Sequence, residues 1–397
     1  MSDFETDKYS FLEDPQWQSF LKKNQGRSVG EILFSLKNPV IDRKVLGQQI
    51  VGQQIINKKV PSWTKTTGLV FPPKINLEQS SSEVTAKYKA NIVKGQSFID
   101  LTGGIGVDSF FLAKSFPFGI HCEISKELQY IANRNLNQLQ SPVKSYHTDG
   151  FKFLRNTKNT FDLIYLDPSR RDINNNKVIK LEDYEPNILD NLNLILSKGK
   201  RILLKTSPLL DIKTSITKLP YLNEIHIVGV NNECKELLFL FGQKSTQKIG
   251  LHCVDLGKDN YFSFDYQEEA QKSEQSLPSS YLYEPNACIL KAGAFNTIGN
   301  RFNIKKLHTN THLYTSNALL NHFPGRIFKI SNVLQLDKKR ISNVIRSQKA
   351  NISKRNFPMS VAEIRKKTGL KDGGNDYLFA TTLMNGELRV LICKKLK

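Results

Sequence analysis

Apolar residues in the first 60 positions recur three or four residues apart among glutamine and lysine, which is the pattern of amphipathic helices. The pair Pro72-Pro73 then marks an extended link, and Ser80–Glu83 has the form of a capping box that opens a helix ending at Val93. We predict a helical region over residues 1–78 that packs on the following domain rather than binding substrate. Candidates on the second helix for lining a cofactor pocket are Glu83, Lys87 and Tyr88.

Between residues 97 and 242, short apolar runs alternate with amphipathic stretches, which indicates a doubly wound α/β sheet. The last two apolar runs, Glu224–Val230 and Glu236–Gly242, are joined by only five residues. That link is too short for a parallel crossover, so we expect an antiparallel hairpin there. The other predicted strands are 97–100, 119–124, 143–148, 161–166 and 200–206, and the predicted helices are 107–114, 126–139 and 183–197.

The remainder of the chain reads as smaller α+β units. Residues 246–277 hold a predicted hairpin and a polar linker, 278–322 form a small α+β module, and 325–397 form a further α+β segment. Asn385-Gly386, between two apolar runs, is a signal for a type I′ hairpin turn.

The segment Asp100–Asp108 carries the clearest chemical signal, because a glycine-rich turn between a strand and a helix forms a nucleotide-type pocket. A dinucleotide loop needs a third glycine, and Ser109 stands at that position after Gly104 and Gly106. Asp100 and Asp108 would also repel a diphosphate, whereas they suit the ammonium and sulfonium groups of S-adenosylmethionine. Charge therefore favours the methyl donor, although a plain strand-to-helix turn stays an alternative for the loop alone.

Further acids stand where the next predicted strands end. Glu123 can accept both hydroxyls of a ribose, and Asp149 can accept a hydrogen bond from the exocyclic amine of adenine. Each acid alone could be a helix cap or a solvated turn residue. Together with Asp100 they mark one edge of the sheet, which is where open α/β sheets bind ligands.

Composition indicates a soluble globular protein of two or three domains, with 39% hydrophobic residues and a mean hydropathy of -0.38. No apolar run approaches the roughly 20 residues of a membrane helix, and the polar N-terminus is no signal peptide. The 5 cysteines lack a C-x-x-C pair and the 7 histidines lack metal-ligand spacing. We therefore expect a cytoplasmic protein without disulfides and without a metal.

Positive charge is concentrated near the C-terminus. The net charge of the chain is +20, and residues 325–397 hold 17 Lys and Arg against 5 Asp and Glu, a net of +12. Such a basic segment favours polyanions, because binding phosphates releases counterions. A solvated face that only promotes solubility is the alternative, and nucleic acid is the favoured partner.

Asp167-Pro168-Ser169-Arg170 follows the fourth strand, and with it the chain resembles class I S-adenosylmethionine-dependent methyltransferases over roughly residues 80–245. The shared motifs are D-x-x-x-G-x-G at Asp100, the acids Glu123 and Asp149, and D-P-x-R at Asp167. The resemblance implies a Rossmann-like core of seven strands over residues 79–245 that binds S-adenosylmethionine. The implied cofactor-binding residues are Asp100, Thr102, Gly103, Gly104, Gly106, Glu123, Ile124, Asp149, Gly150 and Asp167.

The whole chain resembles a bacterial group of methyltransferases with a ferredoxin-like insert and a C-terminal THUMP-like domain. Tyr283–Ala287, Lys349–Pro358 and Gly373–Tyr377 carry this resemblance. It implies a ferredoxin-like module at residues 278–322 and a THUMP-like domain at 325–397. Because THUMP-type domains are associated with RNA, it also implies a tRNA or rRNA substrate.

The implied catalytic residues are Asp167, Pro168, Ser169 and Arg170. Amine methyltransferases that act on bases usually carry D/N-P-P followed by an aromatic residue that stacks on the flipped base. Ser169 and Arg170 replace the second proline and the aromatic residue, which puts base-amine chemistry in doubt. Arg170 could stack on a base or hold a phosphate, or it could pair with Glu182 or Asp183. Pyrimidine C5 chemistry lacks a neighbouring cysteine nucleophile, and Lys205 could contact substrate or lie at the surface.

These patterns predict direct, in-line methyl transfer from S-adenosylmethionine to RNA. One alternative is a methyltransferase for a protein or a small molecule. Another is an RNA-binding protein that keeps the cofactor fold without catalysis.

Overall fold

The computed structural model describes residues 6–24, 26–35, 42–170, 180–244, 248–257 and 260–396. The chain divides into two compact units: a core unit of residues 1–222 and 238–245, and a C-terminal unit of residues 223–237 and 246–397. The five predicted domain boundaries stay predictions. Among the described residues, no helix is both long enough and apolar enough to cross a bilayer.

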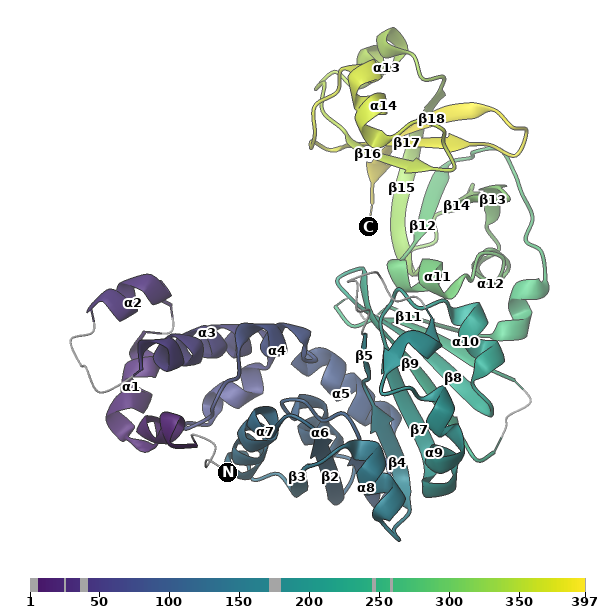
Figure 1. The fold of residues 1–397 in the computed structure, drawn as a ribbon. Helices are drawn as coiled ribbons and strands as arrows, with labels where there is room; N and C mark the ends of the chain where they lie inside the picture. Colours follow the sequence, from purple (N-terminus) through teal and green to yellow (C-terminus); the bar gives the residue numbers. More distant parts are fainter. Residues whose placement is uncertain are drawn as a thin grey trace. The chain divides into compact units, whose positions relative to one another are not determined.

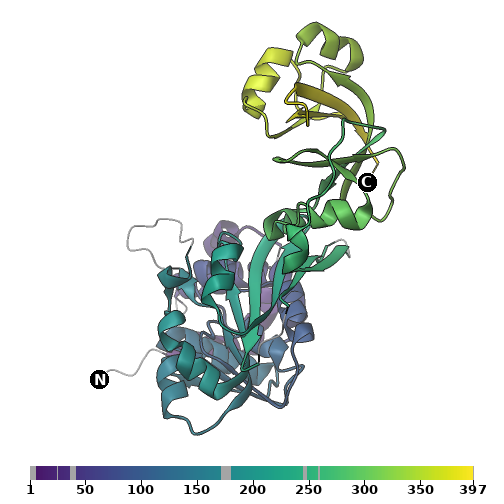
Figure 2. The same cartoon turned by 90° about the vertical axis from the view of Figure 1, so that its right-hand side faces the viewer.

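The first sheet has nine strands in the order β11-β10-β8-β9-β7-β4-β1-β2-β3, with helices on both of its faces (Figures 1 and 2). Strands β1, β2, β3, β4 and β7 pair in parallel, so their carboxyl ends meet at one edge. The strand bounds are β1 Ser97–Asp100, β2 Phe118–Glu123, β3 Val143–His147, β4 Phe161–Leu166, β7 Gly199–Thr206, β8 Leu222–Val230, β9 Glu233–Gly242, β10 Gly250–Asp255 and β11 Asn260–Asp265. The helices between them are α6 Val107–Leu112, α7 Lys126–Gln138, α8 Gly150–Asn156, α9 Leu192–Lys198 and α10 Ile212–Lys218.

Strand β9 lies between β7 and β8, as expected for the antiparallel seventh strand of a class I methyltransferase sheet. Only Asn231 and Asn232 separate β8 from β9, and both have positive φ, 53° and 64°. Two residues with positive φ form a type I′ turn, which joins antiparallel neighbours. The predicted α/β fold class and the β8–β9 hairpin are therefore confirmed. The sheet does not end there, because β10 and β11, from the segment predicted as a separate hairpin and linker, extend it beyond β8.

The N-terminal region packs on helix α7 of the core through a 3-10 helix, Thr6–Glu13, and the extended link. Tyr9, Leu12 and Val70 form one cluster with Ile131 of α7. The extended link is held on both sides by amides: Gln49 exchanges hydrogen bonds with the backbone of Phe71 and Asn135 with that of Val70, at 2.7–2.9 Å. The helices are α1 Pro15–Lys23, α2 Val29–Ser35, α3 Arg43–Lys59, α4 Lys74–Gln79 and α5 Glu83–Ile92.

The second sheet has seven strands in the order β13-β14-β12-β15-β18-β17-β16. Strand β18 lies between β15 and β17 and pairs with both of them antiparallel. The strand bounds are β12 Tyr281–Pro285, β13 Lys305–His308, β14 Thr311–Ser316, β15 Gly325–Leu334, β16 Asn351–Arg355, β17 Asp376–Thr382 and β18 Leu388–Lys395. The helices are α11 Ala287–Ala292, α12 Thr297–Phe302, α13 Lys338–Val344 and α14 Val361–Thr368.

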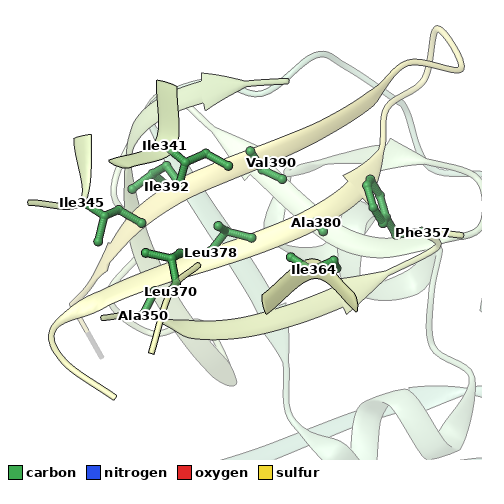
Figure 3. Close-up of a cluster of buried hydrophobic side chains, with 10 residues drawn as sticks. All are labelled: Ile341, Ile345, Ala350, Phe357, Ile364, Leu370, Leu378, Ala380, Val390 and Ile392. Carbon is green, nitrogen blue, oxygen red and sulfur yellow. The ribbon is translucent and has the colours of Figure 1, made fainter. Parts of the chain in front are cut away.

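An aliphatic core lies between α13, α14 and the strands β16–β18 (Figure 3). Figure 3 shows Ile341 from α13 and Ile364 from α14 facing Leu378, Val390 and Ile392 of the sheet, and all five are fully buried. Burial of such side chains contributes roughly 1.5–3 kcal/mol each. This cluster therefore holds the two helices to the sheet through apolar packing.

Several local predictions are wrong. The predicted helix 183–197 is confined to Leu192–Lys198, because Tyr184–Glu185 forms strand β6 paired with β5, Ser169–Arg170. The capping box at Ser80 is also wrong, since Ser82 caps α5 and Glu83 instead accepts a hydrogen bond from Ser62 N at 2.7 Å.

The turn before β18 is also not type I′. Gly386 has φ of 80°, but Asn385 is absent from the described residues with positive φ. Gly386 N donates to Leu383 O at 2.9 Å, so the turn closes one residue earlier than predicted and the glycine serves as its left-handed last residue.

Candidate active site

The loop after β1 is shaped by backbone conformations that favour glycine. Gly106 has φ of 81° and precedes α6. A Cβ on Gly103 would lie 2.2 Å from the ring of His121, so only glycine lets the loop cross this imidazole. Burial lowers the pKa of His121 to about 4, which keeps the ring neutral beneath the loop.

Asp100 is buried at the end of β1, and its carboxylate is used by its own loop. Oδ1 accepts a hydrogen bond from Thr102 N at 3.0 Å, and Oδ2 accepts one from Ser109 Oγ at 2.6 Å. Burial raises the pKa of Asp100 to about 7, and the nearby charges of Asp108 and Asp167 act in the same direction. The strand-end acid thus fixes the loop and is only partly ionised near neutral pH.

Glu123 ends β2 and joins the two loops that follow β1 and β2. Its Oε2 accepts a hydrogen bond from Gly104 N at 2.8 Å, and its Oε1 accepts one from Ser125 N at 2.7 Å. The next residue, Ile124, is 68% exposed, which is unusual for a large apolar side chain beside a buried strand. Glu123 thus offers a carboxylate held in place by two hydrogen bonds, and Ile124 offers an exposed apolar surface beside it.

Asp149 caps helix α8, because its Oδ1 accepts a hydrogen bond from Lys152 N at 2.7 Å. Gly150 packs tightly on the first loop, since a Cβ there would lie 2.3 Å from Leu101 O. The cap accounts for one carboxylate oxygen of Asp149 and positions the residue beside that loop.

A buried network of charges lies behind the loop. Asp108 lies 3.2 Å from Lys89 Nζ and 3.9 Å from Lys205 Nζ. The hydroxyls of Ser81 and Tyr165 donate to its Oδ2 at 2.7 and 2.8 Å. Burial alone would raise the pKa of Asp108, but the two lysines and the hydroxyls hold it below its ordinary value. The two lysines thus offset the charge of Asp108. This corrects the expectation that Asp108 attracts a cationic ligand.

Asp167 stands immediately after β4 and is one-third exposed. Its Oδ2 lies 2.5 Å from Lys205 Nζ, at the end of β7, and its backbone N donates to Thr102 Oγ1 at 2.6 Å. Lys205 is only 11% exposed and also contacts Ser81 Oγ at 3.2 Å. Lys205 therefore links the strand-end acid to the buried network rather than lying at the surface.

Pro168 is buried, whereas Ser169 is exposed and its Oγ donates to Glu185 O at 3.2 Å in the short β5–β6 pair. The backbone of Arg170 belongs to that pair. The side chain of Arg170, and all of Arg171, lie outside the described residues. The alternatives for Arg170 therefore stay predictions.

The described residues form a cavity of about 240 Å³ above the loop. Of the predicted site residues, it brings together Asp100, Thr102, Gly103, Gly104, Asp167 and Ser169. Glu123 and Gly150 reach this group through Gly104 and Leu101 respectively, while Glu83, Lys87 and Tyr88 do not line the cavity. The lining residues not predicted from the sequence are Asn76, Gln79, Ser80, Ser81, Ile105, Val107, Leu128 and Tyr165, and Asp108 also lines the cavity.

Lys89, Ser81 and Tyr165 are the members of the network that the sequence did not predict. Lys89 is fully buried on the face of α5 that also buries Ala86 and Ala90. A lysine within the apolar face of an amphipathic helix signals a buried acid partner, because an ammonium group is almost never buried unpaired.

Comparisons with known proteins agree with this architecture. Family models match residues 281–324 as a ferredoxin-like domain and residues 325–395 as a THUMP domain-like region. The crystal structure of a Porphyromonas gingivalis W83 protein assigned as a methyltransferase shares 30% identity, covers 100% of both chains and has a TM-score of 0.88. No curated protein matches the sequence significantly.

Other solved structures match smaller parts of the chain. One is the T. thermophilus 16S rRNA N2 G1207 methyltransferase in complex with AdoMet and guanosine, at 13% identity, 44% coverage of each chain and a TM-score of 0.32. Another is a Streptococcus mutans protein in complex with SAH, at 13% identity, covering 40% of this chain and 94% of that one, with a TM-score of 0.30. At TM-scores this low, these two structures say nothing about the function of this chain. On the strength of the full-length P. gingivalis relative, the chain belongs to the class I S-adenosylmethionine-dependent methyltransferases of the bacterial group with ferredoxin-like and THUMP-like regions.

Proposed function

We propose that this protein transfers a methyl group from S-adenosylmethionine to RNA. The observation that carries the proposal is that one cavity is lined both by the glycine loop after β1 and by Asp167 after β4. In a parallel sheet these two loops meet at the carboxyl edge, where α/β proteins bind ligands. The full-length relative assigned as a methyltransferase supports the reaction class.

The residues fit S-adenosylmethionine on three counts. First, a ligand can contact the main chain of the loop directly, because Gly103 and Gly104 line the cavity without side chains. Gly104 also has a φ of 55°, a conformation that favours glycine. Glu123 is held by two backbone N–H groups and keeps lone pairs for ribose hydroxyls. Exposed Ile124 offers an apolar surface for the adenine ring.

The cavity is smaller than the roughly 300–1,000 Å³ of ordinary ligand pockets. We therefore infer that only part of the cofactor lies inside it and that the nucleoside extends over Glu123 and Ile124. Asp149 stands at the next strand end, in the place to accept a hydrogen bond from the adenine amine.

S-adenosylmethionine supplies an activated methyl group, so the protein's own task is to hold the acceptor in line and exclude water. Asp167 is the group for that task, since its carboxylate lines the cavity and is one-third exposed. Lys205 fixes the carboxylate from behind and partly offsets its charge. Asp167 can then accept a hydrogen bond from the attacking group of the acceptor.

Two features of the C-terminal unit support RNA as the acceptor. Residues 325–395 match a THUMP domain-like model, and this family resemblance implies RNA. Helices α13 and α14 also present exposed basic side chains. These are Lys338, Lys339, Arg340, Lys366 and Lys367.

The direct test is transfer of tritiated methyl groups from S-adenosylmethionine to total RNA, followed by nucleoside analysis. We expect label in RNA, and Asp167→Ala should lower the rate by about 100-fold, because misplacing the acceptor costs that much. The matched control is Asp162→Ala, since Asp162 forms the same kind of pair with Lys200 (2.7 Å) between β4 and β7.

The control should keep its methyl transfer rate. Label in protein or small molecules with none in RNA would refute the RNA substrate. An undiminished rate for Asp167→Ala would refute the proposed role of Asp167.

A further inference from the structure

Strands β8 and β10 place three metal-binding side chains on one face of the first sheet. The two strands are parallel and in register, so that His226 faces His252 and Glu224 faces Gly250. Residues two apart on a strand point to the same face. The four positions therefore form a square with one glutamate, two histidines and one glycine.

The donor atoms of this square converge. Glu224 Oε2 lies 3.0 Å from His226 Nε2 and 3.8 Å from His252 Nε2. One ligand atom from each residue lies within 4.8 Å of the other two. Ligand atoms about 2.0–2.2 Å from one tetrahedral zinc ion are separated by roughly 3.3 Å, so the observed spacing needs only small side-chain movements to close.

The surroundings favour an ion as well. Gly250 leaves room at the fourth corner, because a Cβ there would lie only 3.2 Å from His252 Nε2. The site is open on one side, since the side chain of His226 is 5% exposed, that of His252 21% and that of Glu224 42%. An ion can therefore enter from the side of Glu224, while the imidazole of His226 is shielded from water.

An outer partner orients one of the histidines. His252 Nδ1 lies 2.6 Å from the hydroxyl of Tyr261 on β11. When a histidine binds a metal through Nε2, the other ring nitrogen carries a proton and usually donates it to a neighbouring oxygen. Tyr261 is placed to accept that hydrogen bond.

We propose that Glu224, His226 and His252 bind one Zn²⁺ ion, with water in the remaining coordination position. Two imidazoles and one carboxylate are a ligand set that zinc accepts. The ion would tie β10 to β8 and thereby stabilise the C-terminal unit. This site is separate from the cavity lined by Asp100 and Asp167, because none of its three ligands lines that cavity.

The test is titration of the EDTA-treated full-length protein with Zn²⁺ by isothermal titration calorimetry. We expect one ion per chain. His252→Ala should weaken binding at least 100-fold, and Tyr261→Phe by about 10- to 100-fold, as the loss of an outer partner usually does. His322→Ala, at an exposed histidine of the same unit, is the control and should bind as the wild type does.

Glu224→Gln provides a second variant at the most exposed ligand, in case His252→Ala fails to fold by circular dichroism. Zinc should also raise the melting temperature of the wild type but not that of either ligand variant. Absence of stoichiometric binding to the wild type, or equally tight binding to a folded His252→Ala or Glu224→Gln protein, would overturn the proposal.

Discussion

Each compact unit buries one carboxylate between two cations, yet the two arrangements differ in where the cations lie. In the core unit, Asp108 pairs with Lys89 and Lys205, which are 0% and 11% exposed. In the C-terminal unit, Glu284 on β12 pairs with Arg326 and Arg355, which are 31% and 36% exposed. Glu284 lies 2.6 Å from both Arg326 Nε and an Arg355 side-chain nitrogen.

The difference shows what each cluster depends on. Lys89 cannot turn to water if its partner is lost, whereas the two arginines of Glu284 are already about one-third exposed. Removing one partner of a fully buried pair leaves a charge without compensation, which costs about 3–5 kcal/mol. The core unit's network should therefore be fragile, and the cluster at Glu284 should be tolerant.

The largest effect is expected for Asp108→Asn, which should lower the free energy of unfolding by about 3–5 kcal/mol. Both tryptophans, Trp17 and Trp63, lie in the core unit, so denaturation followed by tryptophan fluorescence reports that unit. The matched variant, Glu284→Gln, should cost about 1–3 kcal/mol, measured by circular dichroism. Equal losses for the two variants would contradict the distinction between the clusters.

A smaller effect concerns the surface of the C-terminal unit. Lys366→Gln combined with Lys367→Gln should weaken RNA binding. The slope of log affinity against log salt concentration should become shallower by up to roughly 1.4–1.8, which corresponds to the loss of two phosphate contacts. Stability should change by less than about 0.5 kcal/mol, because both side chains are exposed. The measurement is fluorescence anisotropy with labelled RNA between 50 and 200 mM salt, roughly the range where such slopes are read.

The control for that change is Lys213→Gln, at an exposed lysine of α10 in the core unit. Its salt slope should match that of the wild type. An unchanged slope for the double variant would remove α14 from the RNA surface.

A further effect is a pH dependence from Asp100. Its pKa is raised to about 7 in the folded protein, against about 3.9 in an unfolded chain. The folded state thus holds the proton more tightly, and its stabilising contribution is complete below about pH 4 and lost as pH rises through 7. Between pH 5 and pH 8, the melting temperature of the wild type should fall relative to that of Asp100→Asn, whose side chain cannot ionise.

Asp162→Asn serves as the control with the opposite sign. The hydrogen bond from Lys200 lowers the pKa of Asp162, so its contribution is lost only as the solution becomes acidic. Its difference from the wild type should stay constant between pH 5 and 8. If Asp100→Asn also shows a constant difference, the carboxyl of Asp100 does not titrate in that range.

Sequence alone predicted the main strands of the core along the chain and the acids at their ends. The strands follow from local apolar runs, and the acids were recognised because open α/β sheets bind ligands at the carboxyl edge. It misjudged Asp108, whose charge is offset by Lys89 from a separate helix. It also missed the pairing of His226 with His252, since that depends on the register of β8 against β10 and not on spacing along the chain. Tertiary register and burial are the quantities that local patterns do not encode.

The position of β18 has a consequence for how the protein is made. This strand is a late element of the sequence, yet it is inserted between β15 and β17 in the middle of the second sheet. While the chain is being synthesised, the edge of β15 that β18 covers must therefore stay unpaired until the β17–β18 hairpin has left the ribosome. Exposed strand edges are where chains aggregate, so the nascent protein should depend on chaperones most strongly during that interval.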